Sequence, residues 1–188
     1  MEDVNYIVSG LERSGTSMIM QILEAGGFPV LYDNKRESDI HNPKGYYELK
    51  EGKIIRGLMN KTFNVDEYKG LAIKITSYGL NYLPKGKYKI IYIERDINEV
   101  FASQQKMMGD TLKFNLKDKE VKRILIKMNN QIKNYINNRN DIELLYVKHR
   151  NFFTNPKKEI YKISKFIGKF DIENAYKSID KNLYRNKC

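Results

Sequence analysis

Short apolar runs separated by polar stretches dominate the pattern of this chain. Four of these runs are continuous rather than alternating, and they predict strands over 4–9, 71–75, 89–93 and 142–147. Continuous apolar runs are typical of strands that are covered on both faces, as in a parallel sheet with helices on each side. The pattern therefore indicates a central, mostly parallel sheet.

Between these runs lie segments whose apolar residues recur at helical spacing. They predict helices over 16–25, 48–59, 98–108, 121–136 and 156–167, a short extended piece over 28–32 and a polar loop over 33–47. Because strands alternate with helices, the expected fold class is α/β, a doubly wound sheet with helices on both faces in three layers. In such sheets ligands bind at the carboxyl ends of the strands.

Length and composition favour one α/β domain over residues 1–188, with a helical, basic C-terminal portion from about residue 113. The chain is 41% hydrophobic, which is too apolar for a disordered chain, and no run of about 18 apolar residues predicts a membrane span. The acidic start, MEDVNYIVSG, does not have the pattern of a signal peptide, and a cytoplasmic location is expected. A single cysteine, Cys188, and two histidines favour neither a disulfide framework nor a metal site.

The net charge of +11 is concentrated in one part of the chain. Residues 1–112 hold 15 basic and 15 acidic residues, whereas residues 113–188 hold 19 basic and 8 acidic ones. A polyanionic partner is one interpretation of this excess. Because 26 of the 34 basic residues are lysine, in a chain also rich in Asn and Ile, AT-biased coding also explains it. We therefore do not expect nucleic acid as the main partner, and the oligomeric state stays open.

The segment after the first predicted strand carries the clearest chemistry. Gly10 and Gly15 have the G-x4-G spacing of a phosphate-binding loop, but Thr16 stands where that loop has lysine. Glycines allow backbone amides to converge on an anion, and the start of the following helix adds a positive dipole end. Arg13 adds a full charge, while Thr16 and Ser17 add hydroxyl groups. The missing lysine argues against an ATPase, and a plain strand–turn–helix connection is the alternative.

Two segments together resemble the sulfotransferases that use 3′-phosphoadenosine 5′-phosphosulfate (PAPS). SGLERSGTSM resembles their 5′-phosphosulfate loop, although Glu12 stands where proline is common, and we expect Glu12 to point away from the anion. KIIYIERDINEVFASQQKMM resembles their 3′-phosphate segment, with Arg95 at the strand end and Ser103 about two turns into the next helix. An ion pair of Arg95 with Asp96 or Glu99 is the alternative.

Other segments of the chain extend the resemblance. LAIKITSYGL resembles the second-strand segment, which implies that Lys74 faces the transferred group, but Thr76 replaces the histidine base of the cytosolic branch. His149-Arg150-Asn151 stands where many members have Tyr-Glu-Asp, and IDKNLYRNK resembles a bacterial ending that implies a role for Arg185. The resemblance thus implies a cofactor-binding set of Arg13, Ser14, Gly15, Thr16, Ser17, Arg95, Ser103 and Arg185.

The resemblance implies a P-loop NTPase-like fold and an enzyme that moves a sulfuryl group from PAPS to a hydroxyl or amine acceptor. Transfer would be in line and without metal, and it would leave 3′-phosphoadenosine 5′-phosphate (PAP). Arg13 and Lys74 would stabilise the transferred group, and a carboxylate would take the acceptor proton. Glu48 and Asp33 are equal candidates for this base. Behind them stand Glu37, Asp39 and His41.

Two other functions stay open at the level of the sequence. A P-loop nucleotide or small-molecule kinase predicts binding of ATP with Mg²⁺. A non-catalytic protein of the same fold predicts salt-sensitive binding of polyanions through the basic C-terminal portion. The sequence does not identify the sulfate acceptor, for which a carbohydrate or a small hydroxylated molecule is favoured.

Overall fold

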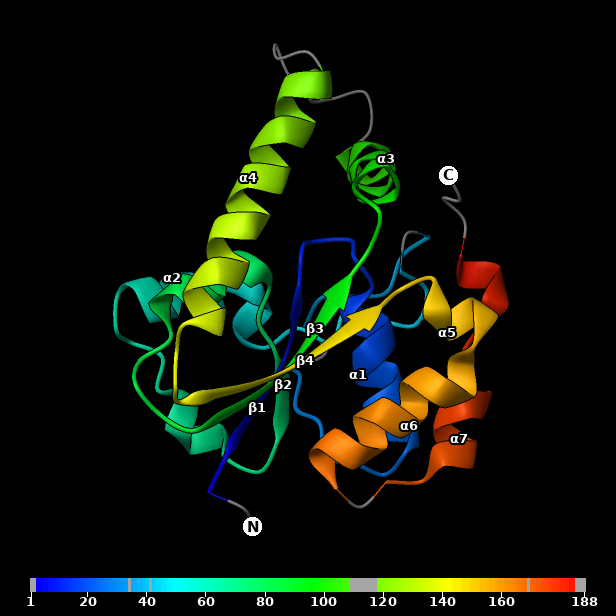
Figure 1. The fold of residues 1–188 in the computed structure, drawn as a ribbon, viewed down its shortest axis with the longest axis horizontal. Coiled ribbons are helices and arrows are strands. Elements are labelled where there is room, and N and C mark those ends of the chain that lie inside the picture. The colour runs from blue at the N-terminus through cyan, green and yellow to red at the C-terminus, as the bar shows by residue number, and fades with distance from the viewer. Residues whose placement is uncertain (1–2, 34, 41, 109–117, 169, 185–188) are drawn as a thin grey trace.

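Four parallel strands form one sheet at the centre of the molecule, in the order β2-β1-β3-β4 (Figure 1). The structure is a computed structural model, and it describes residues 3–33, 35–40, 42–108, 118–168 and 170–184. The strands are β1 (Asn5–Gly10), β2 (Ala72–Lys74), β3 (Tyr88–Glu94) and β4 (Ile142–Lys148). Each lies within two residues of its predicted bounds, and the predicted α/β class with a parallel sheet is confirmed.

Helices and short 3₁₀ turns connect the strands. The helices are α1 (Thr16–Ala25), α2 (Ile54–Met59), α3 (Ile97–Met108), α4 (Asp118–Asn137), α5 (Asn151–Thr154), α6 (Pro156–Ile167) and α7 (Ile172–Lys177). The 3₁₀ turns are η1 (Lys50–Gly52), η2 (Val65–Tyr68), η3 (Ser77–Tyr82) and η5 (Lys181–Leu183). In the described part of the chain, no helix combines the length and the apolar character that crossing a membrane requires.

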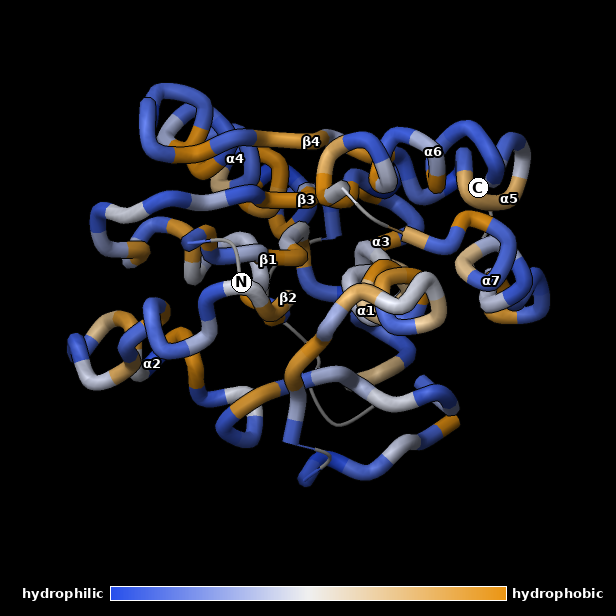
Figure 2. The backbone as a smooth tube through the Cα atoms, turned by 90° about the horizontal axis from the view of Figure 1, so that it is seen from below, coloured by the Kyte–Doolittle hydropathy of each residue, from blue (hydrophilic) through white to orange (hydrophobic). Residues whose placement is uncertain are grey.

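Helices cover both faces of the sheet, because successive side chains of a strand point to opposite sides. In β1, Tyr6 and Val8 pack into a cluster with residues of α1, α6 and α7. Ile7, between them, packs on the other face with residues of α2, η3 and α4. Figure 2 shows the strands as the apolar centre of the molecule. The continuous apolar runs of the sequence are therefore explained by burial on two faces.

The two edges of the sheet differ. β4 forms one edge, and Val147 is the only residue of this strand that is fully buried. At the other edge, the predicted extended piece over 28–32 runs beside β2, where the amide of Leu31 donates to the carbonyl of Ala72 at 3.0 Å. This extra pairing explains why all three residues of β2 are buried.

The helix predicted over 48–59 is wrong in its first half. The structure has the η1 turn there, and α2 begins only at Ile54. Glu51 has a left-handed backbone (φ 55°), and its amide donates to the carboxylate of Asp33 at 2.9 Å. Because this amide bonds a side chain far away in sequence, the segment turns instead of continuing as a helix.

The topology of the sheet places a crevice at the carboxyl ends of β1 and β3. These neighbouring strands pair in register, with Gly10 opposite Ile93. The chain leaves β1 into α1, which packs on one face, and it leaves β3 through α3 into α4, which packs on the other face (Figure 1). Connections that diverge in this way open a ligand site between the two strand ends.

Candidate active site in an anion-binding pocket

The loop between β1 and α1 has the backbone of an anion cradle. Arg13 and Gly15 both have positive φ values, 70° and 110°, so the loop turns sharply before the helix starts at Thr16. Among the described residues, no side chain caps α1, so its first amides are available to an acceptor outside the helix. A Cβ at Gly15 would lie 2.7 Å from Cδ2 of His149, which leaves room only for glycine.

Three hydroxyl residues follow Arg13 in the loop and the first turn of α1, in different environments. Ser14 is buried, and within the described residues its Oγ atom has no hydrogen-bond partner. Thr16 is also buried, and it lines the pocket above the loop. Ser17 donates to the carbonyl of Tyr46 at 3.0 Å and accepts from Asn42 Nδ2 at 3.1 Å. A buried hydroxyl without a partner, beside open helix amides, fits a loop that receives the oxygens of a ligand.

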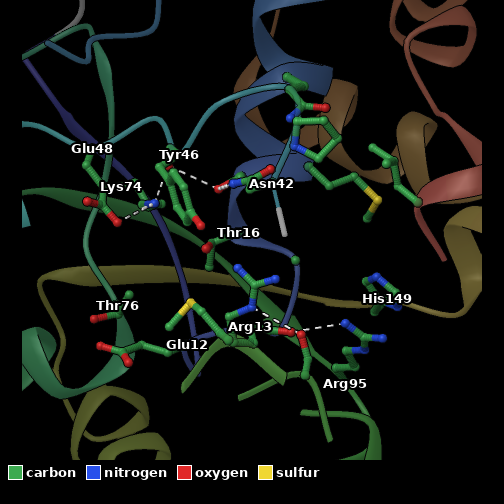
Figure 3. A pocket seen from close by; sticks show the side chains of 18 of the residues that line it. Glu12, Arg13, Thr16, Asn42, Tyr46, Glu48, Lys74, Thr76, Arg95 and His149 are labelled. Carbon is green, nitrogen blue, oxygen red and sulfur yellow. Dashed lines mark hydrogen bonds and ion pairs between the residues drawn. The ribbon is translucent and has the colours of Figure 1, made fainter. Parts of the chain in front are cut away.

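The two sequence motifs meet in space. Arg13 Nε donates to Ser103 Oγ at 3.1 Å, and Arg95 Nη1 donates to the carbonyl of Arg13 at 3.1 Å. Arg95 also forms the ion pair with Glu99 that was the alternative for its role, with Nε at 2.8 Å from Oε2. Figure 3 shows both side chains among those that line one pocket. The ion pair therefore orients Arg95 at the loop without removing it from the pocket.

Glu99 is held from a second side by the C-terminal segment. Its side chain is buried, and the Tyr184 hydroxyl donates to its Oε1 atom at 2.7 Å. The ring of Tyr184 stacks on Phe153 with a centroid separation of 4.6 Å, and it meets His149 edge to face at 5.2 Å. Tyr184 thus packs beside Arg95, with its ring centroid 5.9 Å from the Arg95 guanidinium carbon.

A second charged group lies at the end of β2. Lys74 is 8% exposed and donates to the carbonyl of Tyr46, and its Nζ lies 3.5 Å from Glu48 Oε1. Arg36 Nη1 approaches the same carboxylate oxygen at 3.1 Å, and its guanidinium lies over the Tyr46 ring. Burial lowers the pKa of Lys74 to about 8, and the charge of Glu48 opposes this change.

His149 is a buried histidine that the sequence reasoning did not place in the site. It follows the carboxyl end of β4, lines the pocket, and its Nδ1 has no hydrogen-bond partner among the described residues. Burial, with a smaller effect of the Arg95 charge, lowers its pKa to about 3. The imidazole is therefore neutral at physiological pH. His149 lies just after a predicted strand, and this position at a strand end was the sequence signal that pointed to a place in the site.

One pocket gathers most of the residues that the sequence singled out (Figure 3). The predicted site residues that line it are Arg13, Gly15, Thr16, Ser17, Glu48, Lys74, Arg95 and Ser103. Ser14 is buried beside them. Arg185 and His41 lie outside the described residues. Among the described residues, no three His, Cys, Asp or Glu side chains are grouped to hold a metal ion.

The positions of Asp33 and Glu12 differ from those predicted from the sequence. Asp33 is not part of the pocket, because its carboxylate accepts the amides of Lys35 at 3.1 Å and Glu51 at 2.9 Å. Glu12, expected to point away from the anion site, lines the pocket instead (Figure 3). Of the two equal candidates for the base, the structure therefore brings only Glu48 to the pocket.

The fold and this pocket define an α/β protein with a phosphate-loop-type site at a switch point of its sheet. The family model of the sulfotransferase domain matches residues 3–188, and the chain belongs to this family of transferases. A search of curated proteins finds no match. The match spans both the loop after β1 and the segment around Arg95, and the family that the sequence resemblance indicated is confirmed.

Solved sulfotransferase structures share the fold at low sequence identity. Mouse sulfotransferase SULT7A1 complexed with PAP matches with a TM-score of 0.58 and 14% identity, over 100% of this chain and 69% of that one. The sulfotransferase domain of the Synechococcus PCC 7002 olefin synthase matches with a TM-score of 0.60 and 16% identity, over 96% and 78%. Retinol dehydratase in a complex with retinol and PAP matches with a TM-score of 0.55 and 12% identity, over 99% and 67%.

Proposed function

We propose that this sulfotransferase uses PAPS and transfers its sulfuryl group to a hydroxyl or amine group of an acceptor. The observation that carries the proposal is the hydrogen bond between Arg13 and Ser103, because it joins the two nucleotide-binding motifs in one pocket. SULT7A1 and retinol dehydratase, which share the fold, were both solved with PAP. The acceptor class favoured by the sequence, a carbohydrate or small hydroxylated molecule, and the cytoplasmic location stay predictions.

The β1–α1 loop would hold the 5′-phosphosulfate end of PAPS. Donors come from the open amides at the start of α1, the Thr16 hydroxyl, and the Ser14 hydroxyl, which has no partner among the described residues. The one proton of the Ser17 hydroxyl is donated to the carbonyl of Tyr46 at 3.0 Å, so Ser17 would contribute through its position beside the ligand. Arg13 contributes a positive charge and a planar group of N–H donors that suits phosphate and sulfate oxygens. These donors are held in place by the loop before any ligand arrives, so they need little reorganisation to stabilise negative charge during transfer.

Arg95 and Ser103 would hold the 3′-phosphate, with Arg185 as the further candidate from the sequence. Glu99 orients the guanidinium of Arg95, because its Oε2 atom lies 2.8 Å from Arg95 Nε. The carbonyl of Arg13 holds Nη1 at 3.1 Å, so the position of Arg95 is tied to that of the loop. A charge placed by two contacts can distinguish PAP from ADP, which has no 3′-phosphate.

Lys74 would face the sulfuryl group from the end of β2, opposite Arg13. Its ammonium group is held by the carbonyl of Tyr46 and by Glu48, and only 8% of the residue is exposed. A buried cation of this kind interacts strongly with a charge that develops beside it, because little water screens the interaction. Glu48 supports Lys74 in this role. Of the two base candidates from the sequence analysis, Asp33 and Glu48, only Glu48 lines the pocket.

Thermal unfolding with three ligands in parallel tests the function: PAP, ADP, and ATP with Mg²⁺. At about 100 times its dissociation constant, PAP should stabilise the protein by about 2.7 kcal/mol, well beyond ADP. Stabilisation by ATP with Mg²⁺ and not by PAP would favour the kinase alternative. If none of the three stabilises the protein, and polyanions bind in a salt-dependent manner, the proposed function is wrong.

A further inference from the structure

Glu12 is a carboxylate within the anion-binding loop, one residue before Arg13. Its backbone carbonyl accepts from Gln104 Nε2 at 3.2 Å, which anchors the residue to α3. Its side chain is exposed and extends along the pocket toward Thr76 (Figure 3). The carboxylate lies close enough to Lys74 for its charge to favour the protonated ammonium group. Glu12 thus faces the region where the sulfuryl group would be transferred.

The other carboxylates near this region are already committed. Glu48 is held between Arg36 at 3.1 Å and Lys74 at 3.5 Å, so its carboxylate is already engaged in two ion pairs. Asp33 accepts two backbone amides outside the pocket. For the carboxylate of Glu12, by contrast, the described residues provide no hydrogen-bond or ion-pair partner. An exposed carboxylate of this kind can contact an acceptor group without breaking a structural contact.

We propose that Glu12 is the general base of the sulfuryl transfer. The inference rests on the proposed function. The acceptor oxygen forms a bond to sulfur while its proton moves to the Glu12 carboxylate. The bond between sulfur and the phosphate oxygen of PAPS breaks, and its electron pair stays on PAP. The proton then leaves Glu12 for water, and no group is oxidised or reduced. Thr76, toward which Glu12 points, has no proton-accepting group of this strength.

Isothermal titration of PAPS and PAP into wild type and Glu12→Gln tests whether the Glu12 carboxylate lies beside the sulfuryl group. The two ligands differ by the sulfuryl group, so removal of a negative charge beside it should strengthen PAPS binding about 5-fold and PAP binding less. Because Glu12 is exposed, the variant should fold normally, which its thermal unfolding will show. Glu67→Gln is the matched control, since Glu67 is exposed on η2, away from the pocket.

The rate of PAP formation from saturating PAPS gives the second readout, with water or an added alcohol as acceptor. Loss of a general base lowers a rate by about 10²–10⁴-fold, and Glu12→Asp should recover part of that loss. PAPS affinity in Glu12→Gln equal to that of wild type overturns the inference. The inference is also overturned if Glu12→Gln forms PAP at the wild-type rate while Glu48→Gln forms it more slowly. If wild type binds neither PAPS nor PAP, the proposed function itself has failed.

Discussion

Arg13 Nε and Ser103 Oγ lie 3.1 Å apart, although 90 residues separate them in sequence. One belongs to the loop after β1 and the other to α3, so the contact bridges the crevice between β1 and β3. In the proposed PAPS site, the two motifs supply donors to one pocket from different elements. The contact shows how the pair Arg95 and Ser103, a weak signal when taken alone, lies beside the loop that carries the clearer signal.

Replacing Arg13 by alanine should weaken PAP binding by about 1.5–3 kcal/mol, which is about 10–150-fold in affinity. The side chain contributes its own charge, and its loss also leaves Ser103 without this donor. Isothermal titration of PAP measures the change. Arg123→Ala on the exposed surface of α4 is the control and should keep the wild-type affinity. Equal affinities for Arg13→Ala and wild type would separate the loop from nucleotide binding.

Replacing Gly15 by alanine should destabilise the fold more than the same change at Gly27. Both glycines have positive φ values, 110° and 78°, so alanine is strained at each position. A Cβ at Gly15 also meets His149 at 2.7 Å, whereas nothing lies within 4 Å of one at Gly27. Urea unfolding should show an additional loss of about 2 kcal/mol at Gly15. Equal losses would mean that backbone strain alone determines the need for glycine.

Lys74 should make the stability of the protein increase with pH above 8. Burial lowers its pKa to about 8, while the unfolded chain has the ordinary value of 10.5. Between these values the unfolded state binds more protons at this residue, so the free energy of unfolding rises with pH. Relative to Lys74→Met, wild type should gain about 1–2 kcal/mol between pH 7.5 and 9.5 in urea unfolding. Parallel curves for the two proteins would contradict the lowered pKa.

His149 should have the corresponding effect on the acid side. Its pKa is about 3 in the folded protein and 6.5 when unfolded, chiefly because of burial. Between these values the unfolded state again binds more protons, so stability falls as pH decreases below 6.5. Wild type should lose about 2 kcal/mol more than His149→Phe between pH 6.5 and 4.5. Carboxylates present in both proteins cancel in this difference, and equal losses would show that His149 titrates normally.

Local sequence was sufficient where neighbouring residues decide the structure. The helix over 16–25 and the helix over 156–167 have their predicted bounds, because glycines end the first and proline begins the second. The strands were also predicted closely, since burial on two faces leaves a continuous apolar run. The loop over 10–15 could be interpreted from its glycines and Arg13 alone.

Only the tertiary structure decided which of the chemical groups lie together. From the sequence, Asp33 and Glu48 were equal candidates for the base. In the structure Asp33 accepts two backbone amides, while Glu48 forms an ion pair with Lys74 in the pocket. The same contact of Asp33 with Glu51 lies in the first half of the helix that local pattern predicted over 48–59, where the structure has a turn and α2 begins only at Ile54. His149 entered the site because β4 ends beside the loop. Residue type and spacing set local conformation, whereas these choices depend on contacts between distant segments that exist only once the sheet has formed.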